Sequence, residues 1–538
     1  MLGTARWGPK FCAPIAVEWT IVTPLARPLL DARALGDNGR VRKALGWAAI
    51  GAALALLPAL ALFGFTVDDA LIPARYAAHL ARGLGYRFNA GGPSTDGVTP
   101  LGWAFLLAPF AGRGALAALA AAKVIGLVAW TAAAGAIGAA IHRASERPVR
   151  YAALALIAFS APLAAWSVAG LETGLCTAIA AGAVAARGFG RGRLGAASAG
   201  IAAALRPELL PWALVVSVAP GPRNPGAEVS EPTGLSDPRT WWRGAIAGLP
   251  FVLVAMLRFG IFGRFAPLSV MAKPPDAALG AKYAIACFLL TGPVALVAPI
   301  AWSRLEGWPR GLVLATLTHF VAIALAGGDW MPLSRLVVPV LPGAALAAAY
   351  VASVVDARVA LLRIAVALAG EIFALVKVGP EAARVGADRR QLIQELSGVL
   401  SGAHVVASVD AGWVGAATEA TIVDLAGVTD PAIAALPGSH TSKRLPPALF
   451  DTRQVDTLVL LLRDHESVRT PWAESSFSRE VEWRAAMMAR EDFELVAESH
   501  GRLHYLVLRR AGSRLGGCRG GEAPMTVRLS DLEGRLGP

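Results

Sequence analysis

The sequence predicts an α-helical, polytopic membrane domain followed by a small soluble α/β domain. The 538-residue chain contains 55% hydrophobic and only 16% charged residues, whereas roughly a quarter of the residues of an ordinary soluble domain are charged. Long apolar runs recur up to Val378, and charged residues become frequent from Glu381 onward. We therefore interpret the mean hydropathy of +0.54 as that of a membrane domain with a soluble domain behind it.

The membrane domain is predicted to occupy residues 44–379. Its apolar runs approach the roughly 20 residues needed to cross a bilayer, and several are rich in Ala and Gly, as in closely packed membrane helices. We expect about nine to eleven crossings. The clearest runs are residues 45–65, 116–141, 151–166, 171–186, 244–257, 284–302, 311–326, 336–355 and 359–378.

The N-terminal segment, residues 1–43, is predicted to be weakly ordered and cytoplasmic. The first apolar run begins too far along the chain, and is too long, for the core of a secretory signal. Basic residues precede it at Arg33, Arg40, Arg42 and Lys43, which favours a cytoplasmic N-terminus. The loop at residues 66–99 and the C-terminal domain are then predicted on the outer, periplasmic side of an inner or plasma membrane.

The C-terminal domain is predicted at residues 380–510, an ordinary domain size. Short β-type runs occur at residues 404–409, 421–425, 455–462, 493–497 and 503–508. The tail, residues 511–538, has no periodic pattern and is predicted to be flexible. Much of the net charge of +12 lies beside apolar segments, which favours membrane lipids as partners and does not indicate nucleic acid.

An acidic pair, Asp68 and Asp69, stands where the first apolar run ends. Adjacent carboxylates at the lip of a membrane helix are costly to desolvate and repel each other, so we interpret the pair as functional. Pro73 suits the first turn of a helix, and Tyr76 and Leu80 then share one face, as a helix lying along the membrane surface requires. The alternative is that the pair caps this helix.

Further motifs follow the pair in a fixed order. The loop contains Arg75-Tyr76-Ala77, Gly83-Leu84-Gly85, Phe88-Asn89 and Thr99-Pro100-Leu101. Later segments read Gly170-Leu171-Glu172-Thr173, Leu205-Arg206-Pro207-Glu208, Ala272-Lys273, Gly327-Gly328-Asp329 with Arg335, and Asp424-Leu425-Ala426-Gly427-Val428-Thr429-Asp430. Together they resemble the GT-C superfamily of polytopic glycosyltransferases, closest to the branch of mycobacterial terminal arabinofuranosyltransferases.

The resemblance implies a sugar transfer with inversion, from a polyprenyl-phosphate donor to a hydroxyl of an outer glycan or lipid acceptor. A pentofuranose is the sugar of the nearest branch. Such a reaction needs a base for the hydroxyl proton and cations for the departing phosphate. We assign Asp68 as the base and Asp69 as its partner, and expect Lys273 and Arg206 to bind the donor phosphate.

Contacts with the substrates are expected from further polar side chains of these motifs and of one loop in the C-terminal domain. They are Arg75, Tyr76, His79, Asn89, Glu172, Asp329, Arg335 and His440. Structural alternatives stay open: Lys273 as a solvated residue, Arg206 as a local partner of Glu208, Glu172 as a helix cap, and Asp329 and Arg335 as partners of each other.

Nucleotide-dependent chemistry is not indicated, because the sequence has no Walker A pattern, no dinucleotide fingerprint and no nucleophile elbow. The sequence requires no cofactor, while a divalent cation near Asp68 and Asp69 stays open. The competing class is a transporter or channel with an exported binding domain, since intramembrane charges also line substrate pathways. Transporters usually contain internal repeats, and we find no clear repeat.

Overall fold

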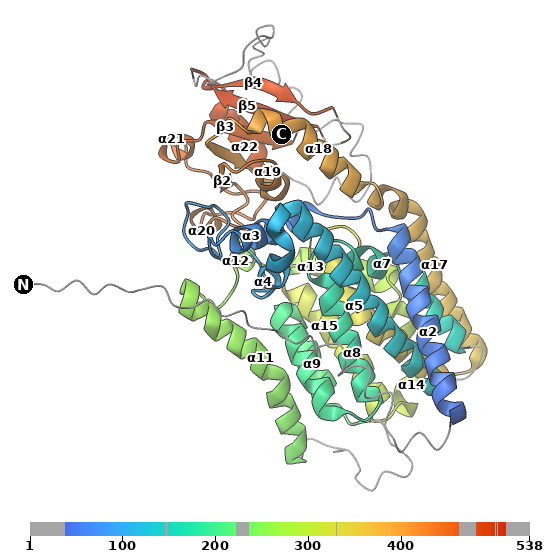
Figure 1. Cartoon of the computed structure of the whole chain (residues 1–538). Coiled ribbons are helices and arrows are strands. Elements are labelled where there is room, and N and C mark those ends of the chain that lie inside the picture. The colour runs from blue at the N-terminus through green and yellow to red at the C-terminus, as the bar shows by residue number, and fades with distance from the viewer. Residues whose placement is uncertain are drawn as a thin grey trace, which may run out of the picture.

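The structure is a computed structural model that describes residues 38–145, 149–221, 236–297, 299–329, 331–461, 480–500, 502 and 504–512. The predictions for residues 1–37 and 513–538 lie outside the described residues. Figure 1 shows a bundle of long helices with a small sheet domain stacked on one end. This is the predicted class, a helical polytopic domain followed by a small α/β domain.

Six helical segments of the described chain are long and apolar enough to cross a membrane, so the chain is an integral membrane protein. They are α2 (Asn38–Ala61), α5 (Ala115–Ala144), α11 (Pro238–Phe262), α15 (Trp308–Leu325), η7 with α16 (Arg335–Val340, Leu341–Val354), and α17 (Ala357–Ala382) running into α18 (Val385–Leu400). A seventh candidate is the pair α6 (Val149–Ala158) and α7 (Ala161–Ser167), bent by 48°. The predicted nine to eleven crossings are not confirmed.

Shorter helices account for much of the difference. They are α8 (Thr173–Gly188), α9 (Gly192–Leu205), η5 (Pro207–Leu209), α10 (Leu210–Val218), α13 (Ala277–Leu290), η6 (Pro293–Leu296) and α14 (Pro299–Arg304). Gly190, with a positive φ of 76°, separates α8 from α9, and Pro207 keeps Arg206 out of helical geometry. The breaks bring polar residues between apolar segments.

Small residues let the bundle helices approach closely. A Cβ atom on Gly138 of α5 would lie 2.5 Å from the carbonyl oxygen of Trp47 in α2 and 3.0 Å from the Cα of Gly51. The Ala and Gly content read from the sequence thus has a direct packing role, because close backbone contact drives the association of membrane helices.

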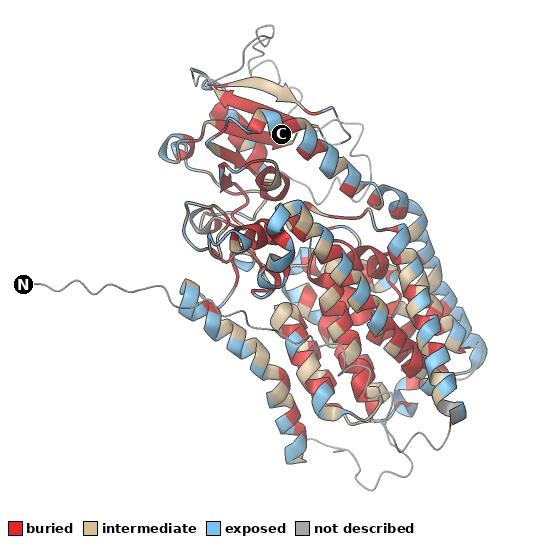
Figure 2. Ribbon diagram, viewed as in Figure 1, coloured by how far each residue is buried: buried red, intermediate tan, exposed pale blue. Residues whose placement is uncertain are grey.

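The first loop, which we define as residues 62–114, lies between the bundle and the sheet domain. It contains η3 (Asp68–Ala70), α3 (Leu71–Ala81), α4 (Trp103–Leu107) and η4 (Ala108–Arg113). The helix predicted around Pro73 is present, but every residue from Leu71 to His79 is buried. Figures 1 and 2 show the reason: α3 is covered by α5 on one side and by the sheet domain on the other.

The C-terminal domain, from α18 onward, contains a five-stranded sheet of order β2-β1-β3-β5-β4. Its strands are β1 (Val405–Ser408), β2 (Thr421–Asp424), β3 (Thr457–Leu461), β4 (Phe493–Glu498) and β5 (Tyr505–Arg510). β1 pairs parallel with β2 and β3, whereas β5 pairs antiparallel with β3 and β4. Each strand overlaps a predicted β-type run, and β5 extends two residues beyond its run.

Helices surround this sheet, and the sheet shares its core with the first loop. The helices are α19 (Ala411–Ala417), α20 (Pro431–Ala434), α21 (Leu449–Thr452) and α22 (Glu480–Ala489). One apolar cluster joins Tyr76 and Trp103 of the loop to Trp413 and Tyr505 of the domain. The short helix α12 (Leu268–Ala272) packs against α20 through Ala434. The domain is therefore packed on the loops, not tethered at a distance.

Candidate active site

Asp68 faces the C-terminal domain. Only 7% of its surface is exposed. Its Oδ2 accepts a hydrogen bond from the backbone N–H of Gly412 at 2.9 Å, and its Oδ1 accepts one from Trp413 at 2.8 Å. These groups begin α19, where N–H groups have no partner inside the helix. Burial, and then the nearby carboxylate of Asp410, raises the pKa of Asp68 from 3.8 to about 7.

Asp69 faces a different set of charges. It is half-buried, and within the described residues its carboxylate makes no side-chain hydrogen bond. Burial raises the pKa of Asp69 above its ordinary value, while the nearby cations Lys273 and Arg335 act in the opposite direction. Two consecutive carboxylates therefore have separate surroundings, one bonded to backbone and one beside cations.

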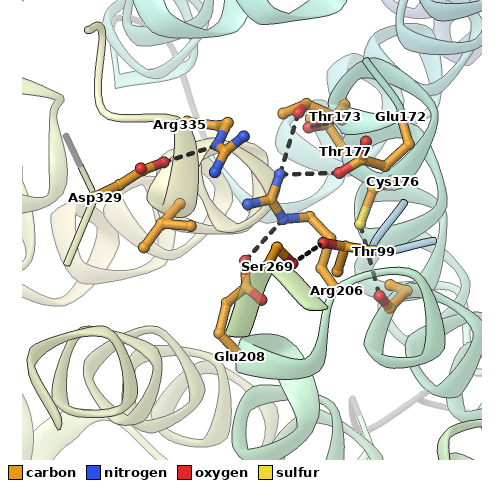
Figure 3. A network of polar contacts seen from close by, with 12 residues as sticks. Thr99, Glu172, Thr173, Cys176, Thr177, Arg206, Glu208, Ser269, Asp329 and Arg335 are labelled. Carbon is orange, nitrogen blue, oxygen red and sulfur yellow. Dashed lines mark hydrogen bonds and ion pairs between the residues drawn. The ribbon is translucent and has the colours of Figure 1, made fainter. Parts of the chain in front are cut away.

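Arg206 lies at the centre of a polar network, shown in Figure 3. Its Nε donates to Glu208 at 2.7 Å, and its Nη1 donates to Glu172 and to the hydroxyl of Thr173, each at 3.2 Å. The Arg206 side chain is only 5% exposed. Two carboxylates thus already engage this guanidinium, as the local alternative to phosphate binding requires.

Asp329 and Arg335 form a second ion pair beside this network, with 2.7 Å between Oδ2 and Nε. Burial acts to raise the pKa of Asp329, but Arg335 and then Lys273 lower it below its ordinary value. Burial lowers the pKa of Lys273, against the effect of Asp329 and Asp69. Lys273 is half-buried, and its charge interacts with those of both carboxylates.

The segment that carries Lys273 is fixed to the first loop. The backbone N–H of Leu268 donates to the carbonyl of Asp96 at 3.1 Å, and the hydroxyls of Ser269 and Thr99 lie 2.8 Å apart. Asp96 itself pairs with the buried Arg258 of α11 at 2.8 Å. A loop distant in sequence is thereby held close to Asp69.

We call the resulting group of side chains the charged cluster. It contains three cations and four carboxylates, joined by ion pairs or by mutual effects on pKa. Its members are Asp69, Glu172, Arg206, Glu208, Lys273, Asp329 and Arg335. Six of the seven were predicted as site residues, and Glu208 was predicted as the partner of Arg206.

Four other predicted substrate contacts lie in the first loop and make contacts within the protein. Arg75 donates from Nε to the carbonyl of Phe88 at 2.8 Å and from its Nη atoms to carbonyls at the end of α19. Tyr76 Oη lies 2.6 Å from the Thr95 hydroxyl. The remaining pair bonds to backbone at 2.9 Å: His79 to Arg87, and Asn89 to both the N–H and the C=O of Ile422. These contacts explain the positions of the four without a substrate.

The sequence did not single out three residues that surround Asp68. Asp410 follows the end of β1, where sites in parallel sheets form, and it accepts a hydrogen bond from the hydroxyl of Tyr505. Arg389 of α18 donates to the same hydroxyl at 3.0 Å. These three residues lie far from the acidic pair in sequence, so the sequence did not indicate that they are close to Asp68. The predicted contact His440 is half-buried in the loop after α20.

A metal site is not apparent in the part of the chain that the structure describes. No group of three or more His, Cys, Asp or Glu side chains there is arranged to hold a metal ion. A divalent cation near Asp68 and Asp69 stays a prediction.

The fold and the charged cluster define a polytopic helical membrane protein that carries an α/β domain on the same end as its cluster. Residues 383–512 match a family model described as Domain of unknown function (DUF8728). Among solved structures, the chain is similar to the arabinofuranosyltransferase AftD from Mycobacteria, with 17% sequence identity and a TM-score of 0.38. The similarity covers 87% of this chain and 40% of that chain, so the chain spans less than half the length of that protein. No curated protein matches the chain.

Proposed function

We propose that the chain is a membrane glycosyltransferase that moves a sugar from a polyprenyl-phosphate donor to a hydroxyl of a glycan or lipid acceptor. The observation that carries this proposal is the half-buried carboxylate of Asp69, whose charge interacts with those of Lys273 and Arg335. The ordered series of sequence motifs supports the same class, with a pentofuranose as the sugar. An outer location of the site is supported by the basic residues Arg42 and Lys43 in the first turns of α2, at the end of the bundle opposite the C-terminal domain.

The reaction makes one bond and breaks one bond at the anomeric carbon. The acceptor hydroxyl gives its proton to a carboxylate, and its oxygen bonds to the anomeric carbon. The bond from that carbon to the phosphate oxygen breaks, and the electron pair leaves with the polyprenyl phosphate. Attack opposite the leaving group inverts the configuration. A base contributes about 10²–10⁴-fold to the rate of such steps.

Asp69 suits the role of this base better than Asp68. The sequence alone assigns the base to Asp68, but both oxygens of Asp68 accept backbone hydrogen bonds in a buried position. Asp69 is half-buried and has no such bonds within the described residues. Burial raises its pKa, which increases its ability to take a proton.

The cations of the charged cluster suit the departing phosphate. Lys273 is half-buried, and Arg335 leaves its Nη groups outside the Nε contact with Asp329. As the phosphate gains a negative charge, Asp69 gains a proton, so the charge of the cluster becomes less negative at that moment. Arg206, held between Glu172 and Glu208, supports the field of the site instead of contacting the phosphate.

The test is transfer by the full-length protein in lipid vesicles, with labelled polyprenyl-phosphate sugars and an acceptor glycan. Asp69→Asn is expected to lower kcat by about 10²–10⁴-fold. The control Glu419→Gln, at an exposed ion pair, should keep wild-type activity. Wild-type turnover by Asp69→Asn would remove the base assignment. Absence of transfer by the wild type with every donor would instead favour the transporter class.

A further inference from the structure

We infer that Asp68 is a positioning residue, which anchors helix α19 of the C-terminal domain and thereby sets the orientation of Asp69. This inference rests on the proposed function, since it assigns the base to the neighbouring carboxylate. It makes the C-terminal domain a working part of the site, although the domain contributes none of the charged cluster.

One short segment of the first loop holds α19 at both ends. Asp68 accepts the N–H groups of Gly412 and Trp413 at the start of the helix, at 2.9 and 2.8 Å. Seven residues later, Arg75 donates to carbonyls at its end, those of Gly415, Thr418 at 2.7 Å and Ala420 at 2.9 Å. Helix ends leave these groups without internal partners, so an anion at the start and a cation at the end are complementary to them. We call this set of contacts the α19 clamp.

Glycine is required where α19 meets the clamp. A Cβ atom on Gly412 would lie 2.1 Å from the carbonyl oxygen of Asp68 and 2.7 Å from its Oδ2. A Cβ atom on Gly415, one turn further along the same face, would lie 2.9 Å from the Cδ of Arg75. Neither residue has a positive φ, so the requirement comes from close approach and not from backbone conformation.

The surroundings of the clamp are rigid. Asp410 occupies the N-cap position of α19, yet its side chain makes no capping bond and instead accepts from Tyr505 Oη. Tyr505 also packs edge-on against Trp413, with 4.9 Å between ring centroids, and accepts from Arg389. The Asp68 carboxylate therefore bonds to a helix whose position is fixed by contacts within the C-terminal domain.

A displacement of α19 and the residues around it must also move Asp69. Asp68 and Asp69 are consecutive residues of η3, a single turn of three residues, so the backbone of one cannot shift without the other. A misplacement of about 1 Å of a reacting group costs about 10²-fold in rate. The α19 clamp thus couples the position of the C-terminal domain to the orientation of the Asp69 carboxylate.

Hydrogen–deuterium exchange of the α19 peptide in the full-length protein tests the anchor without any substrate. Asp68→Asn and Gly412→Ala are each expected to speed exchange of α19 by about tenfold or more. Asn lacks one of the two acceptor oxygens of Asp68, and the Cβ added at Gly412 displaces the Asp68 carboxylate from the start of the helix. The matched control is Gly398→Ala in α18, where a Cβ meets no atom within 4 Å. Unchanged α19 exchange in both variants would overturn the anchor, whether or not the protein transfers sugar.

The pH profile of transfer separates a positioning role from a catalytic one. Asp68→Asn and Gly412→Ala should each lower kcat by about 10²-fold, with the donor KM unchanged. Their double variant should lose no more than either single variant, since both act on one contact. Both should keep the acidic limb of the kcat profile. Loss of that limb in Asp68→Asn but not in Gly412→Ala would overturn the proposal and assign the base to Asp68.

Discussion

Asp68 and Asp69 are neighbours with the same side chain, yet they belong to two different regions. Asp68 lies in the seam between the first loop and the C-terminal domain, where backbone N–H groups of α19 engage both of its oxygens. Asp69 borders the charged cluster, where cations act through space. One region is built from directed hydrogen bonds to backbone, and the other from ionised side chains.

The difference shows how a fold separates two tasks within one turn. Directed bonds to backbone fix the position of a carboxylate, and here they occupy one acceptor site on each oxygen of Asp68. A half-buried carboxylate among cations keeps its capacity to take a proton. The seam therefore supplies geometry and the charged cluster supplies charge, and four variants test whether this division holds.

The largest effect is expected on the cluster side from Arg206→Met. Removal of this cation leaves Glu172 and Glu208 buried without it, and breaking a buried ion pair costs about 3–5 kcal/mol. Thermal unfolding in detergent micelles should therefore begin at a markedly lower temperature. The control is Arg193→Met, at an exposed position of α9, the helix that precedes Arg206. Equal unfolding temperatures for the two variants would show that the cluster does not depend on Arg206.

The second largest effect is expected from Lys273→Met. This variant should lower kcat for transfer by about 10²–10³-fold, because it removes one group that stabilises the charge of the transition state. Lys273→Arg should restore part of the rate because the charge remains. Lys282→Met, at an exposed lysine of α13, serves as the control in the same vesicle assay. A rate unaffected by Lys273→Met would confine the lysine to the surface role that the sequence left open.

On the seam side, stability should depend on pH through Asp68. Its pKa in the folded protein, about 7, lies above the ordinary 3.8, so the folded state binds more protons between these values. The stabilising contribution is then full below about pH 4 and is lost as the pH rises through 7. The nearby charges of Asp410, Arg389 and Asp69 act on the same group. The difference in unfolding temperature between wild type and Asp68→Asn, followed from pH 4 to 8, should change over this window. A constant difference would contradict the prediction.

The smallest effect is expected at the outer edge of the seam. Arg82 and Glu419 lie 3.0 Å apart, with side chains 44% and 74% exposed. Exposed ion pairs contribute about 0–1 kcal/mol, so Arg82→Gln should leave the unfolding temperature and α19 exchange near wild type. A large destabilisation would mean that the seam depends on its exposed charges and not on the α19 clamp.

Local patterns predicted much of the fold. The short β-type runs of the C-terminal domain became β1 to β5, because runs of about four to eight residues rich in β-branched and apolar side chains favour strands. Pro73 in the first turn of α3 was also correctly placed. The number of crossings was less accessible, since short apolar runs such as α9 and α13 are too short to span alone, and their roles depend on neighbours.

The candidate site was also predicted only in part from the sequence. Glu172, Arg206, Lys273, Asp329 and Arg335 were selected from motifs, and the structure brings them together with Asp69. Arg75 and Asn89 were selected by the same reasoning, but their side chains bind backbone groups of the C-terminal domain. A motif gives the residue type and does not reveal its partner. Asp410 and Tyr505 carried no signal beyond the place of Asp410 after a strand.

The sequence by itself determined the long apolar helices, the strands of the C-terminal domain and the presence of an acidic pair at the end of the first apolar run, because hydropathy, periodicity and residue identity are local properties. Only the tertiary structure decided that Asp68 and Asp69 differ. The N–H groups that engage Asp68 come from Gly412 and Trp413, 344 and 345 positions away, and the cations near Asp69 come from other loops. Partners so distant in sequence are set by packing alone.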